Sequence, residues 1–357
     1  MTALSRAGNS GHAGLDYLES LDRTFQAAAQ RTGGACTWSL DIAGTSLRIH
    51  TAGERVRATL MPAIAHRLTP TADRADFDVF VVDAADSGAP LPAFCWRPED
   101  VRERGEVRGF NDARLRTQFD SGSWMLSMLD VARGRAFLAV DGVGRVAPWH
   151  RAAPLRTILH WLLESPTRLL VHAAAVGDSD DGGVLLAGAG GSGKSTTAVV
   201  CAAAGMGYAG DDYVLVEIAG EPVAHSLYTT AKLTDRSLAL LGSTGCSLQA
   251  SVSDGEKQVI DMVQAFPGSL ASVLPLRAIV LPSVEPGAPT RMRRASAGDA
   301  LRALAPTTIY QLPSNGGRAL ASLASLARRL PAYSLTIGDG MPAAAEAVSE
   351  LLRGSLS

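Results

Sequence analysis

Residues 183–196 read Gly-Val-Leu-Leu-Ala-Gly-Ala-Gly-Gly-Ser-Gly-Lys-Ser-Thr, and this stretch decides the fold of the C-terminal half of the chain. A short apolar run leads directly into the pattern Gly-x4-Gly-Lys-Ser, which ends at Ser195. Glycines let consecutive backbone N–H groups turn inward around an anion, and the helix expected over about 194–204 points its positive end at the same anion. The stretch therefore predicts a phosphate-binding loop between a strand and a helix.

The residue types of this loop predict ATP and Mg²⁺ as its ligands. Lys194 supplies a compact charge for the β and γ phosphates, and the Ser195 hydroxyl is placed to bind Mg²⁺. A plain glycine-rich turn is the alternative. The expected nucleotide-binding residues are Gly188, Ala189, Gly190, Gly191, Ser192, Gly193, Lys194, Ser195 and Thr196.

Lysine is rare in this chain. Of 33 basic residues only Lys194, Lys232 and Lys257 are lysines. A lysine presents a compact charge where arginine presents a planar fork, so a lysine in such a chain can mark a tight phosphate contact. We therefore regard Lys232 as a candidate catalytic residue and Lys257 as a further candidate. Two ordinary surface lysines are the alternative.

Length and composition indicate two globular domains. At 357 residues the chain exceeds a typical single domain, and 46% hydrophobic with 19% charged residues is typical of a folded protein. We place the domains at residues 1–150 and 151–357. The first is expected to contain an amphipathic helix over 15–30, several strands and no catalytic cluster, which suits recognition of an acceptor.

Charge and hydropathy exclude several classes of partner. A net charge of -2 offers no basic surface for nucleic acid. The polar residues 1–14 lack the apolar core of a signal peptide, and no run of about 18 apolar residues suggests a membrane span. We expect a cytoplasmic protein that binds neither nucleic acid nor membrane, and a homo-oligomer stays open. The four cysteines do not have the spacing of a zinc site.

Hydrophobic patterning predicts the strands around the loop. Residues 169–176 and 183–187 are apolar runs joined by an Asp- and Gly-rich turn, so we expect a β-hairpin that leads into the loop. Residues 208–218, after the loop's helix, are typical of one continuous strand. This strand is expected to lie beside the loop's own strand.

Two adjacent carboxylates follow the loop. Asp211 and Asp212 lie 17 and 18 positions after Lys194. The intervening helix of about ten residues covers about 15 Å, so the returning strand can bring both carboxylates near the phosphates. One could accept the proton of an attacking hydroxyl and the other hold Mg²⁺; neighbours on a strand face opposite ways, so their roles should differ. A simple Asp-Asp turn is the alternative.

The order of these motifs resembles a known family. His172 precedes the loop in the run Val-His-Ala-Ala-Ala-Val, and Ala-Gly-Asp-Asp, ending at Asp212, follows the loop's helix. The arrangement is similar to the catalytic core of the bacterial HPr kinase/phosphorylase family over residues 168–218, and more loosely to the C-terminus. By itself, a histidine in a strand is also compatible with simple packing.

The resemblance implies a fold and a set of residue roles. The fold would be α/β, with a P-loop kinase core of the HPr kinase and phosphoenolpyruvate carboxykinase type and a mixed sheet, preceded by a smaller strand-rich α+β domain. The activity would be that of an ATP-dependent serine kinase. Asp211 would be the catalytic base, Asp212 and Ser195 would bind the metal, and His172 would help to position the phosphates.

The acceptor is inferred from a departure from that family. The acidic, glycine-containing signature of enzymes that act on HPr is missing, and residues 225–233 read His-Ser-Leu-Tyr-Thr-Thr-Ala-Lys-Leu instead. This run resembles divergent members that include kinases of ribosomally made precursor peptides, so we expect a serine of a peptide or small protein as acceptor. A small-molecule kinase and a non-catalytic nucleotide-binding regulator are the alternatives. Binding alone needs no catalytic base, so the Asp pair favours an enzyme.

Overall fold

The chain forms two compact units. The computed structural model describes residues 2–71, 74–178, 180–242, 248–253, 256–313, 316–338 and 341–354. The units are Met1–Leu162 and Leu163–Ser357, whereas composition suggested a division at residue 150. Each is a mixed α/β structure with its own core. In the described part of the chain, no helix is long and apolar enough to cross a membrane.

The N-terminal unit is built on a seven-stranded sheet of order β3-β1-β2-β4-β7-β6-β5. Its strands are β1 (Ala35–Ile42), β2 (Thr45–Ala52), β3 (Leu68–Thr69), β4 (Phe77–Asp83), β5 (Leu115–Asp120), β6 (Met125–Asp130) and β7 (Arg135–Val140). Its helices are α1 (Thr2–Arg31), α2 (Glu54–Leu60), α3 (Ala84–Ser87), α4 (Pro148–Ala152) and α5 (Arg156–Leu163). The expected helix over 15–30 is the C-terminal part of α1.

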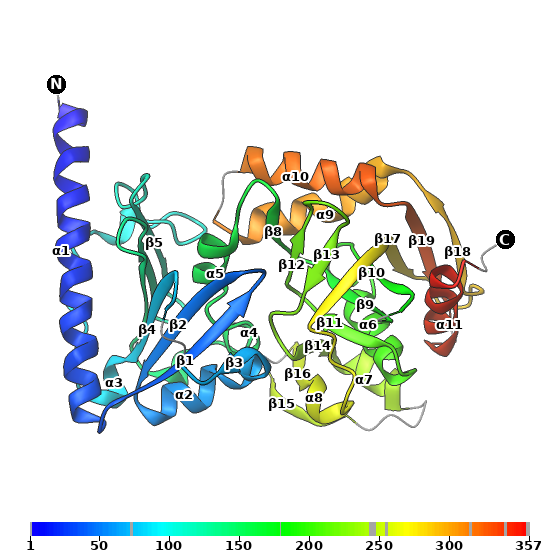
Figure 1. Cartoon of the computed structure of the whole chain (residues 1–357), viewed down its shortest axis with the longest axis horizontal. Coiled ribbons are helices and arrows are strands. Elements are labelled where there is room, and N and C mark those ends of the chain that lie inside the picture. The colour runs from blue at the N-terminus through cyan, green and yellow to red at the C-terminus, as the bar shows by residue number, and fades with distance from the viewer. Residues whose placement is uncertain are drawn as a thin grey trace. The chain divides into compact units, whose positions relative to one another are not determined.

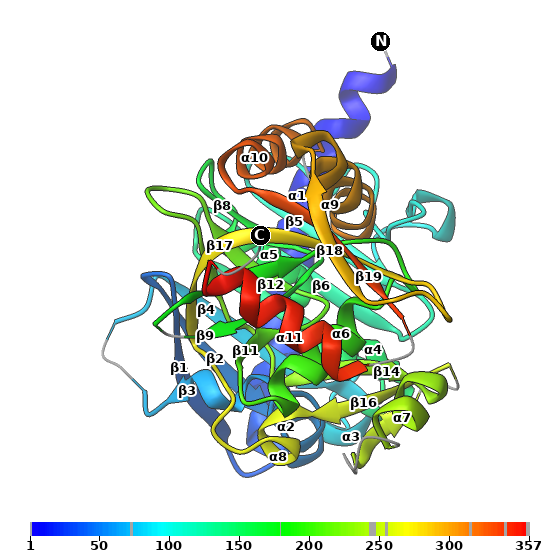
Figure 2. The ribbon, with the colours of Figure 1, turned by 90° about the vertical axis from the view of Figure 1, so that its right-hand side faces the viewer.

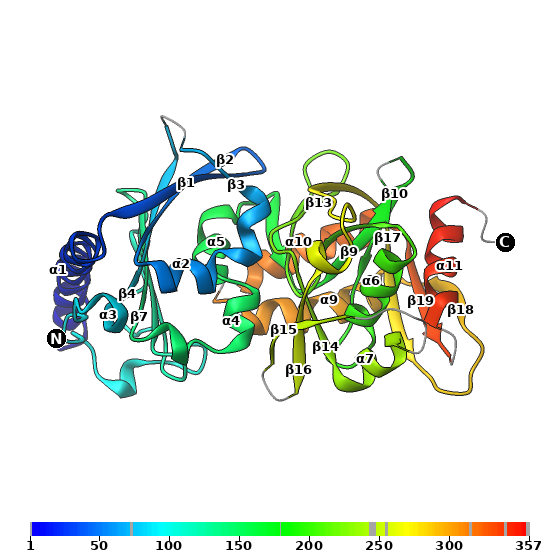
Figure 3. The ribbon, with the colours of Figure 1, turned by 90° about the horizontal axis from the view of Figure 1, so that it is seen from below.

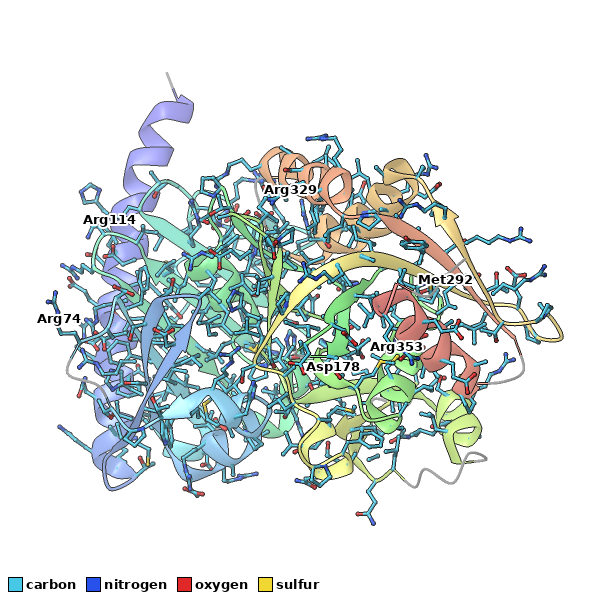
Figure 4. The ribbon with its side chains drawn as sticks, turned by 45° about the vertical axis from the view of Figure 1, so that its right-hand side comes forward. Arg74, Arg114, Asp178, Met292, Arg329 and Arg353 are labelled. Carbon is cyan, nitrogen blue, oxygen red and sulfur yellow. The ribbon has the colours of Figure 1, made fainter. Side chains whose placement is uncertain are left out.

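Helix α1 covers one face of this sheet (Figure 1). Leu18, Leu21 and Phe25 recur at helical spacing, so they share one buried side of the helix. The Phe25 and Phe80 rings pack edge to face, with their centroids 5.0 Å apart. Arg114, labelled in Figure 4, lies just before β5. It donates to both carboxylate oxygens of the buried Asp130 at 3.2 and 3.1 Å.

The C-terminal unit contains a nine-stranded mixed sheet. Its strands run in the order β11-β9-β10-β17-β13-β12-β8, with β19 paired to β17 and β18 paired to β19. Their bounds are β8 (Arg168–Val171), β9 (Ala174–Asp178), β10 (Gly182–Leu186), β11 (Gly207–Gly210), β12 (Val214–Glu217), β13 (Val223–His225), β17 (Val273–Val284), β18 (Arg291–Ala295) and β19 (Ala332–Ile337). Strand β10 pairs antiparallel with β9 and parallel with β17.

Helices cover both faces of this sheet. The helices are α6 (Lys194–Ala203), α7 (Asp235–Gly242), α8 (Met262–Ala265), α9 (Ala297–Gln311), α10 (Gly316–Arg329) and α11 (Met341–Leu352). Helices α6 and α11 pack on one face and α9 and α10 on the other (Figures 1 and 2). Val184 and Leu186 face the first layer and Leu185 the second, so β10 is apolar throughout.

A small three-stranded sheet completes the C-terminal unit. It has the order β14-β16-β15, formed by β14 (Thr230–Thr234), β15 (Ala250–Ser253) and β16 (Lys257–Asp261). It lies beside α6 and α7 (Figure 3). Ala231, Leu233 and Ile260 bury one of its faces in the core under α6.

Two strands that the sequence predicts as continuous are each split in two. The run 169–176 breaks at His172 into β8 and β9, and the run 208–218 breaks at Asp211 and Asp212 into β11 and β12. Beyond each break the strand pairs in a different part of the sheet. Apolar patterning does not reveal these breaks, because the residues stay buried when the strand changes neighbour.

The hairpin of β9 and β10 forms as predicted, with Val184 opposite Val176. The position expected for the returning strand is wrong. Strand β11 pairs with β9, which therefore separates it from β10. The acidic pair still reaches the loop, because it lies in the bend after β11 and not on the strand itself.

Candidate active site

The glycine-rich loop lies between β10 and α6, as the sequence predicts. Gly191 and Gly193 have φ of 80° and 100°, which favours glycine at both positions. A Cβ atom on Gly193 would come within 3.0 Å of Val284 Cγ2, whereas one on Gly190 or Gly191 would meet no atom within 4 Å. The loop is therefore tightly packed at the start of the helix and open at its tip.

Lys194 is buried and folds back over this loop. Its Nζ donates to the carbonyl oxygens of Gly188 at 2.7 Å and Ala189 at 3.2 Å. Burial is the largest influence on its ammonium group and lowers the pKa of Lys194. Among the described residues, the buried Ser192 hydroxyl has no hydrogen-bond partner. Both groups are suited to phosphate oxygens. These would supply a negative charge for the Lys194 ammonium group and a hydrogen-bond acceptor for the Ser192 hydroxyl.

Asp211 joins the loop to the neighbouring small sheet. The Ser195 hydroxyl donates to its Oδ1 at 3.0 Å, and the backbone N–H of Lys232 donates to its Oδ2 at 3.1 Å. Burial, together with the neighbouring charge of Asp212, raises the pKa of Asp211. Its direct partners are a hydroxyl and an amide, so this carboxylate is the less neutralised of the pair.

Asp212 turns to different partners. Its backbone is left-handed, with φ of 71°, which is uncommon for a residue other than glycine. His172 Nε2 lies 3.1 Å from its Oδ1, and the Lys232 ammonium forms an ion pair with its Oδ2. Burial alone would raise the pKa of Asp212, but Lys232 and His172 outweigh it and hold that pKa well below its usual range.

His172 is held by residues that the sequence did not single out. Its backbone N–H donates to Thr308 Oγ1 at 3.1 Å, and its ring packs edge-on against Tyr213 at 5.4 Å. The Tyr213 hydroxyl in turn donates to Gln311 at 2.6 Å. Thr308 and Gln311 lie three residues apart on α9, where two polar residues resemble an ordinary solvent-facing side of a helix. Sequence offers no signal for this role.

The candidate site residues are far apart in the sequence, and the structure brings them together. Lys194 and Ser195 begin α6, the acidic pair follows β11, His172 follows β8, and Lys232 lies on β14. Thr196, the last residue predicted to bind nucleotide, donates to Ser237 Oγ at 2.9 Å. The third lysine, Lys257, lies opposite Thr234 on β16.

The arrangement fits a hydrated Mg²⁺ ion beside a polyphosphate. Magnesium is usually held by one or two carboxylates, a hydroxyl, waters and substrate phosphates. Ser195 and Asp211 supply such a hydroxyl and carboxylate, already in mutual contact. The protein is a mixed α/β protein in which a strand, a glycine-rich loop and a helix carry a lysine and a hydroxyl, with two carboxylates beside them. This arrangement is typical of phosphate-binding loops.

Comparison with solved structures finds similar chains. The chain is similar to the Hpr(Ser) kinase/phosphatase from Coxiella burnetii, with a TM-score of 0.24 and 11% sequence identity over 47% of this chain and 85% of that one. No family model matches the sequence. No curated protein matches it either.

Proposed function

We propose that this protein is an ATP-dependent kinase that transfers the γ-phosphoryl group to a serine hydroxyl of a peptide or small protein. The observation that carries the proposal is the second carboxylate. Asp211 alone, with Ser195, would serve nucleotide and metal binding. Asp212, paired with Lys232 and His172, adds a group that binding does not require.

Mg·ATP, when bound, supplies the reactive phosphoryl group. Lys194 would exchange its two loop carbonyls for phosphate oxygens, and the Ser192 hydroxyl would gain an acceptor. The backbone N–H groups at the start of α6 would add to this positive cradle. These residues bind and orient the donor, and orientation is a large part of catalysis in phosphoryl transfer.

We propose that Asp211 and Asp212 have the reverse of the roles implied by the family resemblance. Asp211 contacts Ser195 and has no directly bonded cationic side chain among the described residues. It is therefore the carboxylate that we assign to the metal ion. Asp212 would accept the proton of the acceptor hydroxyl while the hydroxyl oxygen bonds to the γ-phosphorus and ADP leaves. When Lys232 turns toward the phosphoryl group, Asp212 loses its counter-charge and becomes a stronger base.

Two observations support a peptide or small protein as the acceptor. The run from His225 to Leu233 resembles divergent kinases of precursor peptides. The N-terminal unit adds a second folded body, which suits recognition of a macromolecule better than of a small metabolite.

The test is a phosphotransfer assay with the intact protein. Labelled ATP and Mg²⁺ are incubated with serine-containing peptides and with a panel of hydroxylated metabolites, and mass spectrometry locates the phosphate. We expect label on a peptide serine, and none with Lys194→Ala, which removes the phosphate-binding ammonium. Label confined to a metabolite would favour the small-molecule kinase. Nucleotide binding without any transfer would favour the regulator.

A further inference from the structure

All three lysines of the chain converge on the candidate active site. Lys194 belongs to the loop and Lys232 contacts Asp212. Lys257 lies on β16, the strand that pairs with β14, which carries Lys232. The remaining basic residues of the chain are arginines, so lysine is concentrated where a compact charge can approach a phosphate.

The register of the small sheet gives this convergence a geometric basis. Lys232 pairs with Val259, and Lys257 lies two residues before Val259 on the same strand. Residues two apart on a strand share a face, so Lys232 and Lys257 are diagonal neighbours, a spacing of about 7–8 Å or less. Ala231 and Leu233 fill the core on the opposite face. Lys257 therefore shares the face from which Lys232 reaches Asp212.

Polar contacts hold this sheet against the loop's helix. Thr196 Oγ1 donates to Ser237 Oγ at 2.9 Å, and Ser237 Oγ lies 3.0 Å from Thr234 Oγ1. Thr234 is the direct partner of Lys257 across the sheet. The backbone N–H of Lys232 is itself bound to Asp211. The position of Lys257 is thus linked to the loop by two separate routes.

We propose that Lys257 binds the terminal phosphoryl group of the nucleotide, as the third member of an ammonium cluster with Lys194 and Lys232. The inference rests on the proposed function. A loop lysine reaches the β and γ phosphates, and Lys257 shares the sheet face from which Lys232 reaches the carboxylates beside that loop, so its ammonium group would face the same end of the nucleotide. A third ammonium group at this end would favour a triphosphate over a diphosphate, because the triphosphate carries more negative charge there.

Calorimetric titration of the intact protein tests the proposal. The ligands are ADP and the non-hydrolysable β,γ-imido analogue of ATP, each with Mg²⁺. We expect Lys257→Ala to weaken binding of the triphosphate roughly ten- to a hundredfold and to change ADP binding by no more than about twofold. Lys257→Arg should recover only part of this loss, because the planar guanidinium replaces a compact charge.

Arg328→Ala is the matched control. Arg328 is exposed on α10 just before β19 begins, whereas the loop lies at the opposite, carboxyl end of the parallel strands. The Arg328→Ala substitution removes one positive charge and should leave the affinities for the triphosphate and for ADP unchanged.

Three outcomes would overturn the proposal for Lys257. The first is an unchanged affinity for the triphosphate, and the second is an equal loss of affinity for both nucleotides. The third is loss of folding, measured by thermal unfolding, in both Lys257→Ala and Lys257→Met, since the methionine keeps the aliphatic part of the side chain. If the wild-type protein binds neither nucleotide, the proposed function itself fails, and this inference fails with it.

Discussion

Two identical, adjacent residues in this protein have opposite electrostatic surroundings. Asp211 accepts from a hydroxyl and an amide, and its pKa is raised by burial and by its neighbour. Asp212 faces Lys232 and His172, which hold its pKa low against the effect of burial. A carboxylate without a cation is suited to Mg²⁺, and one that shares a lysine with the phosphoryl group is suited to the acceptor.

This difference predicts distinct effects of two isosteric substitutions. Asp211→Asn should raise the Mg²⁺ concentration needed for nucleotide binding by roughly 10- to 100-fold. Asp212→Asn should lower turnover by roughly 10²- to 10⁴-fold while nucleotide binding persists. Titration of Mg²⁺ at fixed nucleotide and phosphotransfer at saturating Mg·ATP measure the two effects. The opposite pattern would restore the roles that the family resemblance implies.

Asp130 predicts a pH-dependent contribution to stability. Burial would raise its pKa, but Arg114 and the backbone N–H groups of Ala132 and Arg133 outweigh this and lower it. A carboxyl with a lowered folded-state pKa stabilises the protein above its unfolded-state pKa, and this contribution is lost as pH falls through the folded-state value. Asp130→Asn should therefore lower the melting temperature at pH 7 by roughly 2–4 °C, with a smaller difference near pH 3.

Thermal unfolding across this pH range is the measurement. Glu103→Gln is the control, because Glu103 is exposed in the same unit and its substitution removes the same charge. An equal decrease for Asp130→Asn at every pH would show that the ion pair with Arg114 is not the cause.

At the scale of the elements, the junction of loop and helix is the most constrained point. Gly193 caps the N-terminus of α6 with φ of 100°, close to Val284 on β17 and Ile337 on β19. These contacts set the start of α6, and with it the position of Lys194 and Ser195. Gly190, at the loop's tip, has no such neighbours.

Two glycine substitutions should separate the stability of this junction from its binding function. Gly193→Ala should destabilise the protein by roughly 1–3 kcal/mol, because alanine must adopt a left-handed backbone and its Cβ approaches Val284. Gly190→Ala should change stability by less than about 0.5 kcal/mol, yet weaken nucleotide binding by filling open space. Urea unfolding and nucleotide titration measure both. Equal stability of the two variants would contradict the packing argument.

At the scale of the whole molecule, the candidate active site lies within one unit. Its residues belong to Leu163–Ser357, which has cores on both faces of its sheet. The N-terminal unit has a separate core around α1. This division is consistent with chemistry in one unit and a recognition role for the other.

Separation of the units should therefore separate binding from acceptor use. Residues 163–357 expressed alone should bind Mg·ATP about as well as the intact protein, and should phosphorylate the peptide acceptor poorly. Circular dichroism first establishes that the fragment is folded. Nucleotide titration and the peptide assay then follow. Full peptide phosphorylation by a folded fragment would remove the recognition role of the N-terminal unit.

Sequence alone determined the parts of this protein that depend on nearby residues. The loop, its strand and its helix were predictable, because the glycines, Lys194 and Ser195 follow one another and each local preference agrees. The β9–β10 hairpin was predictable for the same reason. The rarity of lysine also marked Lys232 and Lys257 as candidate phosphate contacts, because composition is a property of the chain alone.

Tertiary structure alone decided how these parts meet. The breaks at His172 and at the acidic pair follow from a change of neighbouring strand, and burial on both sides leaves no trace of that change in the apolar pattern. The support of His172 by Thr308 joins residues 136 positions apart. The partners of Asp211 and Asp212 also come from distant strands, and those partners, not the residue type, distinguish the two carboxylates.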